Sequence, residues 1–259
     1  MILDEIAADT RLRVAEAKKK VSMDEIMKRA LSMNTETGFP VEKELKAEGI
    51  HFICEVKKAS PSKGLIAKEF PYLSIAKEYE EAGASVISCL TEPTYFQGRD
   101  EYLKEIAREV SIPVLRKDFT IDPYQIYEAK VLGAAMVLLI CALLDTETLR
   151  EYIGICDKLG LSALVETHDE SEMESALKAG ARIIGVNNRN LKDFTVDIHN
   201  STRLRALAPL DVIFVAESGI KTAEDIRALR EAKVNGVLIG ETLMRSSNKK
   251  QMLDSLSKD

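Results

Sequence analysis

"YEAKVLGAAMVLLI", residues 127–140, joins an amphipathic segment to an apolar run through a single glycine. Helices commonly end on a residue in the left-handed conformation, which glycine adopts at little cost. The run after Gly133 is rich in Val, Leu and Ile, as expected for a parallel strand that is buried on both faces. The stretch therefore predicts a helix, a glycine turn and a buried strand.

The same unit recurs along the chain after residue 50. Copies with a glycine turn, at residues 83, 160 and 180, are "EYEEAGASVISCL" (78–90), "ICDKLGLSALVE" (155–166) and "ALKAGARIIGVN" (176–187). Looser copies are "AREVSIPVLRK" (107–117), "RALAPLDVIFVAE" (205–217) and "REAKVNGVLIG" (230–240). Together with the stretch that begins at His51, they predict eight strands, which start near residues 52, 85, 112, 135, 161, 182, 212 and 235.

Each interval between these strands has room for one helix, as a parallel crossover requires. Eight such βα units favour a closed (β/α)8 barrel, the TIM barrel, over an open doubly wound sheet. We expect one structural domain, with the barrel over residues 50–259 and an N-terminal helical extension over residues 1–49. No dinucleotide-binding glycine motif follows the first strand and no P-loop motif occurs, which argues against both kinds of nucleotide site.

The N-terminal extension is predicted to contain helices near residues 2–20 and 23–33, followed by the polar connector "NTETGFPVEKELKAEG" (34–49). Two placements of the extension remain open at this level. It can cap the bottom of the barrel, at the N-terminal ends of the strands, or it can form a lid over the mouth, at their C-terminal ends.

The composition is that of an ordinary globular protein with a mildly acidic charge. The chain has 259 residues, with 42 Asp and Glu against 36 Lys and Arg. Neither a nucleic-acid surface nor a polybasic membrane patch is expected. The N-terminus lacks the apolar region of a signal peptide, and the longest uncharged run, 14 residues over 131–144, is shorter than the roughly 20 residues that span a bilayer. Cysteines 54, 89, 141 and 156 form no C-x-x-C pair, so we expect buried free thiols in a reducing cytoplasm.

Charged and amide side chains follow the predicted strands at their C-terminal ends. Side chains alternate between the two faces of a strand, so Glu55 and Lys57 share a face opposite Phe52, Cys54 and Val56. Other strand ends carry the following residues: Lys117, Glu166, Asn187 with Asn188, and Glu217 with Ser218. Catalytic groups of such barrels lie at this end of the strands. Because buried charges are costly unless paired, the two lysines and three glutamates are predicted to pair at the mouth.

This set of groups is suited to general acid–base chemistry. A lysine that is crowded by another lysine or partly desolvated is expected to have a lowered pKa, towards the range of a useful acid. A glutamate in an apolar pocket is expected to have a raised pKa and to exchange protons.

Two glycine-containing loops predict a phosphate site. They follow the last two strands, as "ESGIKTAED" (217–225) and "LIGETLMR" (238–245), the position where barrels often bind phosphate. Gly219 and Gly240 allow close approach of the backbone, and each loop leads into a helix whose N-terminus offers N–H groups. Ser60 and Ser62 add hydroxyl donors from the first loop. The three histidines, 51, 168 and 199, are scattered and match no zinc motif, so no metal is expected.

The chain resembles the indole-3-glycerol-phosphate synthase family of tryptophan biosynthesis over residues 50–245. The motifs that carry the resemblance are "CEVKKASPSKG" (54–64), "LTEPTYFQG" (90–98), "VLRKDF" (114–119), "LVETHDE" (164–170), "IGVNNRNL" (184–191), "VAESGI" (215–220) and "LIGETLMR" (238–245). Thr167 departs from the aliphatic residue that is commoner at its position.

The resemblance implies a carboxy-lyase that closes an indole ring on 1-(2-carboxyphenylamino)-1-deoxyribulose 5-phosphate, with loss of carbon dioxide and then water. It implies that Lys117 is the acid of ring closure, that Lys57 holds the carboxylate, with the division of proton donation between the two lysines left open, and that Glu166 is the base or proton relay of dehydration. Glu55, Asn187 and Glu217 are implied to orient these groups. The remaining implied contacts are Ser60, Gly219, Gly240 and the Glu241 backbone for phosphate, Arg189 and Ser218 beside the substrate, and Phe96, Phe119 and Leu138 around its aromatic ring.

The resemblance further implies a phosphorylated small molecule as the substrate, no metal or organic cofactor, no nucleic-acid or membrane partner, and a cytoplasmic enzyme, with a monomer favoured. Two alternatives remain. One is a Schiff-base aldolase with Lys117 as the nucleophile. The other is a non-catalytic sugar-phosphate-binding barrel, which needs the glycine loops but not the combination of Lys117 and Glu166.

Overall fold

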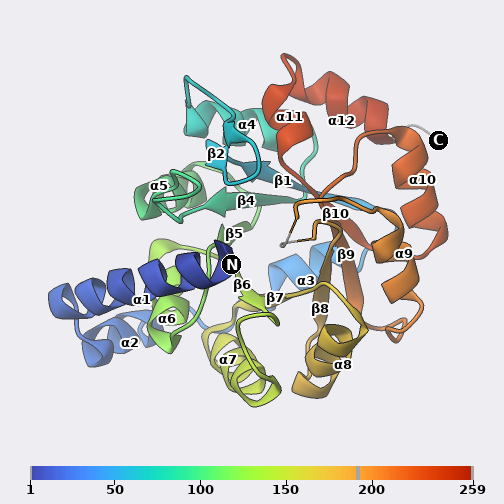
Figure 1. Cartoon of the computed structure of the whole chain (residues 1–259). Helices are drawn as coiled ribbons and strands as arrows, with labels where there is room; N and C mark the ends of the chain where they lie inside the picture. The colour runs from blue at the N-terminus through green and yellow to red at the C-terminus, as the bar shows by residue number, and fades with distance from the viewer. Residues whose placement is uncertain (1, 191–192, 258–259) are drawn as a thin grey trace.

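The computed structural model describes residues 2–190 and 193–257, and over these residues eight parallel strands close into a barrel (Figure 1). Each begins within two residues of its predicted start. The strands are β1 (His51–Val56), β4 (Val86–Leu90), β5 (Val114–Lys117), β6 (Met136–Ile140), β7 (Ser162–Thr167), β8 (Ile183–Asn187), β9 (Ile213–Glu217) and β10 (Gly236–Ile239). β1 pairs with β10, which closes the ring and confirms the (β/α)8 barrel.

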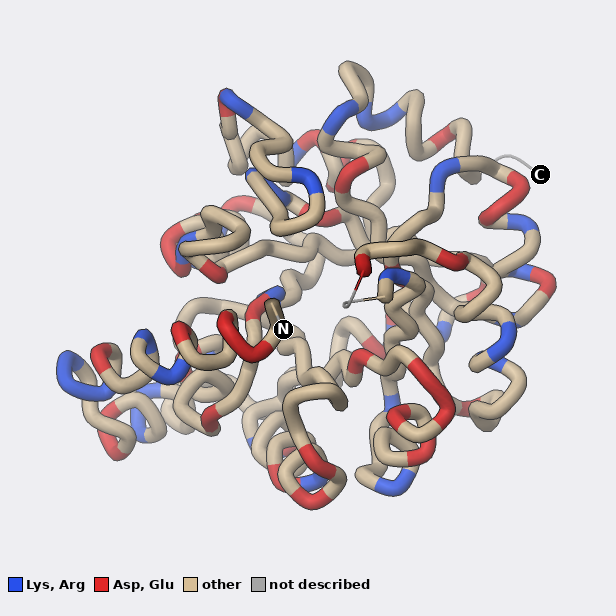
Figure 2. The backbone as a smooth tube through the Cα atoms, viewed as in Figure 1, with Lys and Arg blue, Asp and Glu red and all other residues tan. Residues whose placement is uncertain are grey.

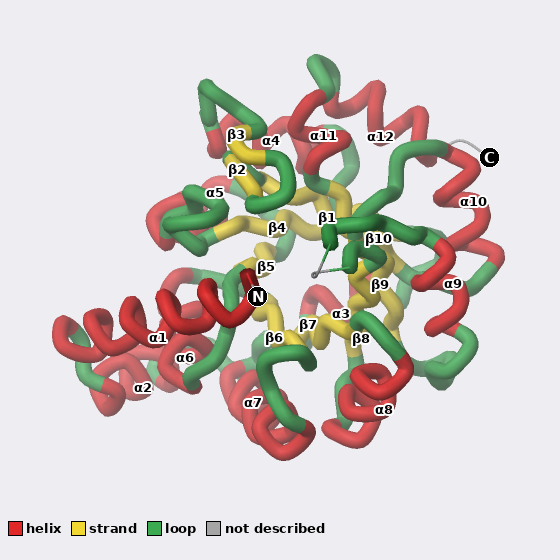
Figure 3. Tube along the Cα trace, in the orientation of Figure 1, coloured by secondary structure: helices red, strands yellow, loops and turns green. Residues whose placement is uncertain are grey.

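Helices alternate with the strands and form the outer layer, where most of the charged residues lie (Figure 2). They are α4 (Tyr72–Glu81), α5 (Asp100–Glu109), α6 (Pro123–Leu132), α7 (Thr146–Leu159), α8 (Glu170–Ala179), α9 (His199–Arg205), α10 (Ala223–Glu231), α11 (Glu241–Arg245) and α12 (Lys249–Ser257). Gly133 and Gly160 end α6 and α7 with φ angles of 95° and 66°, as the repeat predicts. A small hairpin, β2 (Ala59–Ser60) and β3 (Gly64–Leu65), stands outside the ring of strands (Figure 3).

The alternation of side chains along each strand produces two apolar layers. Inward-facing residues such as Ile53, Leu115 and Leu164 fill the barrel. Outward-facing residues such as Cys54 and Val56 pack under the helices. Glu55 follows Ile53 on the inward face, so the sequence-based assignment of faces in β1 is confirmed.

The N-terminal extension covers both ends of the barrel. Both placements that the sequence left open, a cap at the bottom and a cover at the mouth, are therefore present. It consists of α1 (Ile2–Lys20), α2 (Met23–Leu31) and α3 (Pro40–Leu45). In Figure 1 the start of α1 lies near the middle of the ring of strands, and α3 is seen through the ring on its far side. The short helix α3 lies inside the predicted polar connector and was not predicted.

Helix α3 plugs the bottom of the barrel. Val41 and Leu45 are fully buried and belong to the same apolar cluster as the barrel interior. Glu42 accepts hydrogen bonds from Arg182, which stands just before β8 and also pairs with Asp157. One apolar face and one ion-pair network therefore close this end.

Among the described residues, no helix is long and apolar enough to cross a membrane. All four cysteines are free. Cys54, Cys89 and Cys156 are buried as expected, whereas Cys141 is only half-buried because it follows the last residue of β6. No group of three or more His, Cys, Asp or Glu side chains within the described ranges is arranged to hold a metal ion.

Candidate active site

A cavity of about 460 Å³ opens at the mouth of the barrel. Every catalytic and binding residue predicted from the sequence lines it: Glu55, Lys57, Ser60, Phe96, Lys117, Phe119, Leu138, Glu166, Asn187, Arg189, Glu217, Ser218, Gly219, Gly240 and Glu241. Helix α1 adds Ile2, Leu3 and Ile6, which the sequence analysis did not identify. Nothing in the sequence of α1 distinguishes these three residues from ordinary core positions, so only their placement over the mouth identifies them.

Lys117 lies between two buried carboxylates at the end of β5. Its Nζ is 3.4 Å from Glu217 Oε2 and 3.6 Å from Glu55 Oε1. The other oxygen of Glu55, Oε2, accepts a hydrogen bond from Lys57. Glu55 therefore bridges the two lysines, and the predicted pairing of charges is present.

The structure corrects the expected pKa of the lysine. Burial alone would lower the pKa of Lys117, but attraction to Glu217 and Glu55 outweighs burial and raises it above the ordinary value. The expectation of a lowered pKa was wrong because burial and the second lysine have less effect than the carboxylates that pair with Lys117. We therefore expect Lys117 to be an ammonium ion at neutral pH.

Glu217 is the carboxylate whose pKa is raised, to about 7. Burial is the main cause, and attraction to Lys117 only partly offsets it. Its Oε1 has no hydrogen-bond partner among the described residues, and it lies where a Cβ on Gly185 would meet it at 2.3 Å. The absence of a side chain at residue 185 in β8 therefore makes room for this carboxyl group, which can change protonation near neutral pH.

Glu166 at the end of β7 behaves in the opposite way. Burial alone would raise its pKa, but contacts with His168, Lys117 and Asn187 lower it to about 2. Asn187 Nδ2 donates to Oε1 at 3.2 Å, and His168 Nε2 lies 3.3 Å from the same oxygen. The expectation of a raised glutamate pKa is thus right for Glu217 and wrong for Glu166, because Glu217 has only Lys117 to offset its burial, whereas Glu166 is stabilised by His168, Lys117 and Asn187 together.

His168 is the functional candidate that the sequence analysis missed. Burial would lower its pKa, but Glu166 and Glu172 raise it to about 10. The signal available in the sequence was its spacing, since residues i and i+2 of a strand project to the same side. A histidine two residues after a candidate base was a stronger indication than its distance from the other histidines.

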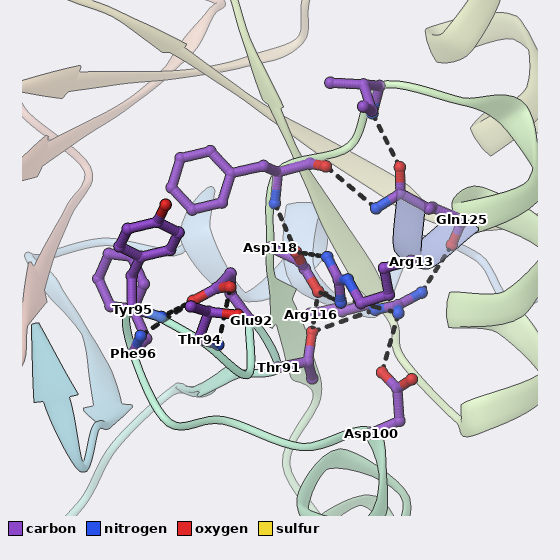
Figure 4. Close-up of polar contacts among 12 residues, drawn as sticks. Arg13, Thr91, Glu92, Thr94, Tyr95, Phe96, Asp100, Arg116, Asp118 and Gln125 are labelled. Atoms are coloured by element: carbon purple, nitrogen blue, oxygen red, sulfur yellow. Dashed lines mark hydrogen bonds and ion pairs between the residues drawn. The ribbon is translucent and has the colours of Figure 1, made fainter. Parts of the chain in front are cut away.

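The neighbours of Lys117 on either side are anchored in a buried polar network (Figure 4). Arg116 donates to Thr91 Oγ1, to Asp100 Oδ1 and to the carbonyl oxygen of Gln125. Asp118 accepts two hydrogen bonds from Arg13 of α1, at 2.8 and 2.6 Å. Helix α1 is therefore tied to the residue that follows Lys117, which fixes the backbone that carries the lysine.

The loop after β4 is shaped by one buried carboxylate, also drawn in Figure 4. Glu92 accepts the backbone N–H groups of Thr94, Tyr95 and Phe96 at 2.7 to 2.9 Å. This turn places the Phe96 ring 5.9 Å from the Phe119 ring, centroid to centroid. The two rings form an aromatic wall beside the charged groups.

The glycine loops lie where the sequence placed them, with two corrections. The N–H groups of Lys221 and Thr222 before α10 donate to Asp225, so the start of α10 is capped by its own residue. At Gly240, an added Cβ would lie 2.3 Å from Glu55 Oε2. Gly240 therefore makes room for the Glu55–Lys57 pair as well as for any ligand.

Asn188 is the strand-end residue that does not line the cavity. It is buried, donates to the carbonyl oxygen of Ser218 and accepts from the backbone N–H and hydroxyl of Ser201. Its place is between the loops, where it supports Ser218.

The chain is thus of the TIM-barrel class, and the paired lysines and carboxylates in its mouth, beside an aromatic wall, are groups suited to general acid–base chemistry. Comparison with known proteins identifies the enzyme family. A model of the family described as "Indole-3-glycerol phosphate synthase" matches residues 3–256. This chain is 62% identical over 248 residues to the indole-3-glycerol phosphate synthase of Ruminiclostridium cellulolyticum, which covers 96% of this chain and 95% of that protein.

The enzyme of the same name from Lachnoclostridium phytofermentans is 54% identical, over 99% of this chain and 98% of its own length. The chain therefore belongs to the indole-3-glycerol phosphate synthase family, and it is a decarboxylating lyase of tryptophan biosynthesis. A solved structure of 3-hexulose-6-phosphate synthase aligns with a TM-score of 0.65 at 13% identity, over 80% of this chain and 98% of that one, which shows a shared fold only.

Proposed function

We propose that this enzyme converts 1-(2-carboxyphenylamino)-1-deoxyribulose 5-phosphate into indole-3-glycerol phosphate, carbon dioxide and water by general acid–base catalysis. The observation that carries the assignment of roles is the contact of Lys117 with both Glu217 and Glu55 on the inner face of the mouth. It supports a lysine that stays charged and is held rigidly for one substrate atom.

Lys117 is assigned to ring closure. When the ring carbon that bears the carboxylate attacks the ketone carbon, negative charge develops on the ketone oxygen. An ammonium ion at that oxygen stabilises the charge and transfers a proton to it, because an alkoxide is a stronger base than an amine. A fixed charge in a site with little water stabilises a transition state more than the same charge in solvent.

Lys57 is assigned to the substrate carboxylate. The electron pair released as carbon dioxide leaves restores the aromatic ring, so the carboxylate must lose its charge at this step. A lysine already neutralised by Glu55 holds the group in place only weakly. The Glu55–Lys57 pair therefore suits orientation of a carboxylate that has to leave.

Glu166 is assigned to dehydration, the last step. The hydroxyl group leaves with a proton from Lys117, while a proton is taken from the adjacent carbon. With a pKa of about 2, Glu166 is always in the form that accepts a proton, although a low pKa reduces its driving force as a base. Glu217, with a pKa of about 7, is suited to return a proton to Lys117 between steps.

The remaining cavity residues are assigned to binding. Ser60, Gly219, Gly240 and the backbone of Glu241 are proposed to bind phosphate, with Arg189 and Ser218 beside the sugar. Phe96, Phe119 and Leu138 are proposed to enclose the aromatic ring. We further propose that the enzyme acts in the cytoplasm as a monomer on this small molecule, with no cofactor and with neither nucleic acid nor a membrane as a partner.

The raised pKa of Lys117 argues against the Schiff-base aldolase, because a nucleophilic lysine must lose its proton. Borohydride treatment in the presence of substrate separates the two reactions. A covalent adduct on Lys117 would contradict the acid–base assignment.

The direct test is turnover by the purified chain. The sequence contains no tryptophan, so indole fluorescence excited at the red edge of protein absorption reports product alone. We expect indole fluorescence and carbon dioxide to appear in equal amounts from the carboxyphenylamino-deoxyribulose phosphate. Inorganic phosphate should compete weakly, and failure to form an indole would contradict the proposal.

A further inference from the structure

The imidazole ring of His168 stands between two carboxylates at the end of β7. Its Nδ1 is 3.0 Å from Glu172 Oε2. Its Nε2 is 3.3 Å from Glu166 Oε1, an ion-pair contact rather than a well-aligned hydrogen bond. The side chain is only 16% exposed, so water competes little with either contact. Glu166 faces the cavity, whereas His168 and Glu172 lie behind it.

The contacts select one protonation state of the ring. An ionised carboxylate can only accept hydrogen bonds, so both ring nitrogens must carry hydrogen to satisfy both partners. The ring is then an imidazolium ion flanked by two negative charges. The positive charge of Lys117 also helps to lower the pKa of Glu166.

The ring is held from behind by the start of α8. Glu172 Oε2 also accepts the backbone N–H of His168 at 2.8 Å, and the backbone N–H of Glu172 donates to Asp169, the N-cap of α8. Asn200 of α9 donates to the carbonyl oxygen of His168 at 3.0 Å. Two outer helices thus fix the histidine on the side away from the substrate.

We propose that His168 is a positioning residue that, together with Asn187, engages Oε1 of Glu166 and so turns Oε2 towards the substrate. Both Asn187 Nδ2 and His168 Nε2 approach the same oxygen, Oε1. A carboxylate held at one oxygen by a hydrogen bond from Asn187 and an ion-pair contact from His168 keeps one orientation. Placement matters for proton transfer, because a misplacement of about 1 Å can cost about 100-fold in rate.

This inference rests on the proposed role of Glu166 in dehydration. It predicts that loss of the His168 contact slows indole formation without slowing the release of carbon dioxide. The contact acts on the base and not on substrate binding, so KM should stay within about twofold. A decrease of about 10-fold in the rate of dehydration is expected, below the limit that misplacement sets.

Two substitutions of His168 separate its two contacts. The amide of His168→Gln reaches as far along the side chain as ring Nε2, so it can still donate to Glu166. The amide of His168→Asn reaches only as far as Nδ1, so it retains the contact with Glu172 alone. Single-turnover release of carbon dioxide and growth of indole fluorescence should be near wild type in the Gln variant, whereas the Asn variant should show slowed indole formation alone.

A double variant tests whether His168 acts through Glu166. In a Glu166→Gln background, His168→Asn should change the rate of indole formation by less than about twofold. His51, at the bottom of the barrel with its Nδ1 3.1 Å from Ser85 Oγ, provides a matched control. His51→Gln should leave both signals unchanged. Thermal melting of each variant confirms that the folded proteins are being compared.

The outcomes are distinguishable. Suppose that Glu166→Gln slows indole formation alone but His168→Asn matches wild type, or that the double variant shows the full product of two separate losses. In either case the positioning role of His168 is wrong and the role of Glu166 stands. If Glu166→Gln slows carbon dioxide and indole together or slows neither, the role of Glu166 in dehydration is wrong and the inference fails with it.

Discussion

The two ends of the barrel are each covered by part of the N-terminal extension, but their chemistry differs. At the bottom, α3 inserts Val41 and Leu45 into the apolar interior, and Glu42 is paired with Arg182. At the mouth, α1 leaves a cavity of about 460 Å³ in which the Glu217 carboxyl group keeps an oxygen without a hydrogen-bond partner among the described residues. Burying such a group is costly. Packing is therefore complete at the bottom, which stabilises the fold, and incomplete at the mouth, where the chemistry takes place.

The largest effect is expected from the lysine at the mouth. Lys117→Ala should lower kcat by about 10²–10⁴-fold or more, because a proton donor in a transition state contributes about that much. Substrate binding should weaken only modestly. Lys77→Ala, which breaks an exposed pair with Glu109, is the matched control and should leave kcat unchanged. Retention of more than a tenth of wild-type kcat in Lys117→Ala would remove Lys117 from its assigned role.

The bottom should respond in stability and not in rate. Leu45 is fully buried, so Leu45→Ala should lower the free energy of unfolding by about 2–5 kcal/mol through lost contacts and a cavity. Urea denaturation measures this loss, and kcat per folded molecule should be unchanged. The matched control is Leu12→Ala on α1. Leu12 is 69% exposed, so this change should alter stability by less than about 0.5 kcal/mol. A kcat that falls along with stability would mean that the two ends are not separate.

Breaking the contact between α1 and Asp118, the residue that follows β5, should affect both stability and kinetics. Arg13→Met leaves Asp118 buried without its main cation, and we expect a loss of about 1–3 kcal/mol because breaking such a pair exposes the cost of burying the remaining charge. Arg13 and Arg116 hold the pKa of Asp118 below its usual range despite burial. This stability is therefore present above the ordinary Asp pKa of about 4 and is lost as pH falls through the lowered value.

Unfolding free energies of wild type and Arg13→Met at neutral pH and near pH 3 measure this contribution. The difference between the two proteins should shrink at the lower pH. A constant difference would show that Arg13 contributes through packing of its aliphatic stem and not through charge. Because α1 also lines the cavity, the KM of Arg13→Met should rise.

The last effect is a pH dependence that only the mouth should show. The pKa of His168 is raised from about 6.5 to about 10 in the folded protein. A group with a raised folded pKa gives stability that is fully present below its unfolded pKa and is lost as pH rises through the folded value. The difference in unfolding free energy between wild type and His168→Gln should therefore fall between pH 6.5 and 10. The destabilisation by Leu45→Ala at the bottom should stay constant over that range, and an equal pH dependence at both ends would contradict the comparison.

Much of the site followed from the sequence because strand direction is encoded locally. In a closed parallel barrel all C-terminal strand ends meet, so a residue such as Glu217 is placed at the mouth once its strand is recognised. The glycine turns reveal the repeating helix–strand unit, and the repeat predicts where each strand begins. Helix α3 was missed because its six residues sit in a polar segment and its apolar face amounts to Val41 and Leu45. His168 was missed because its distance from the other histidines received more weight than its spacing from Glu166.

The sequence by itself determined the fold, the composition of the mouth and the resemblance that names the family, since each depends on patterns within one βα unit or on motifs in order. Only the tertiary structure decided which charge each group carries and what covers each end. The sign of a pKa shift depends on a balance between burial and partners a few ångströms away, and those partners come from different strands. Glu166 and Glu217 occupy equivalent strand ends, yet their pKa values are about 2 and about 7, because His168 and Asn187 are directed at only one of them.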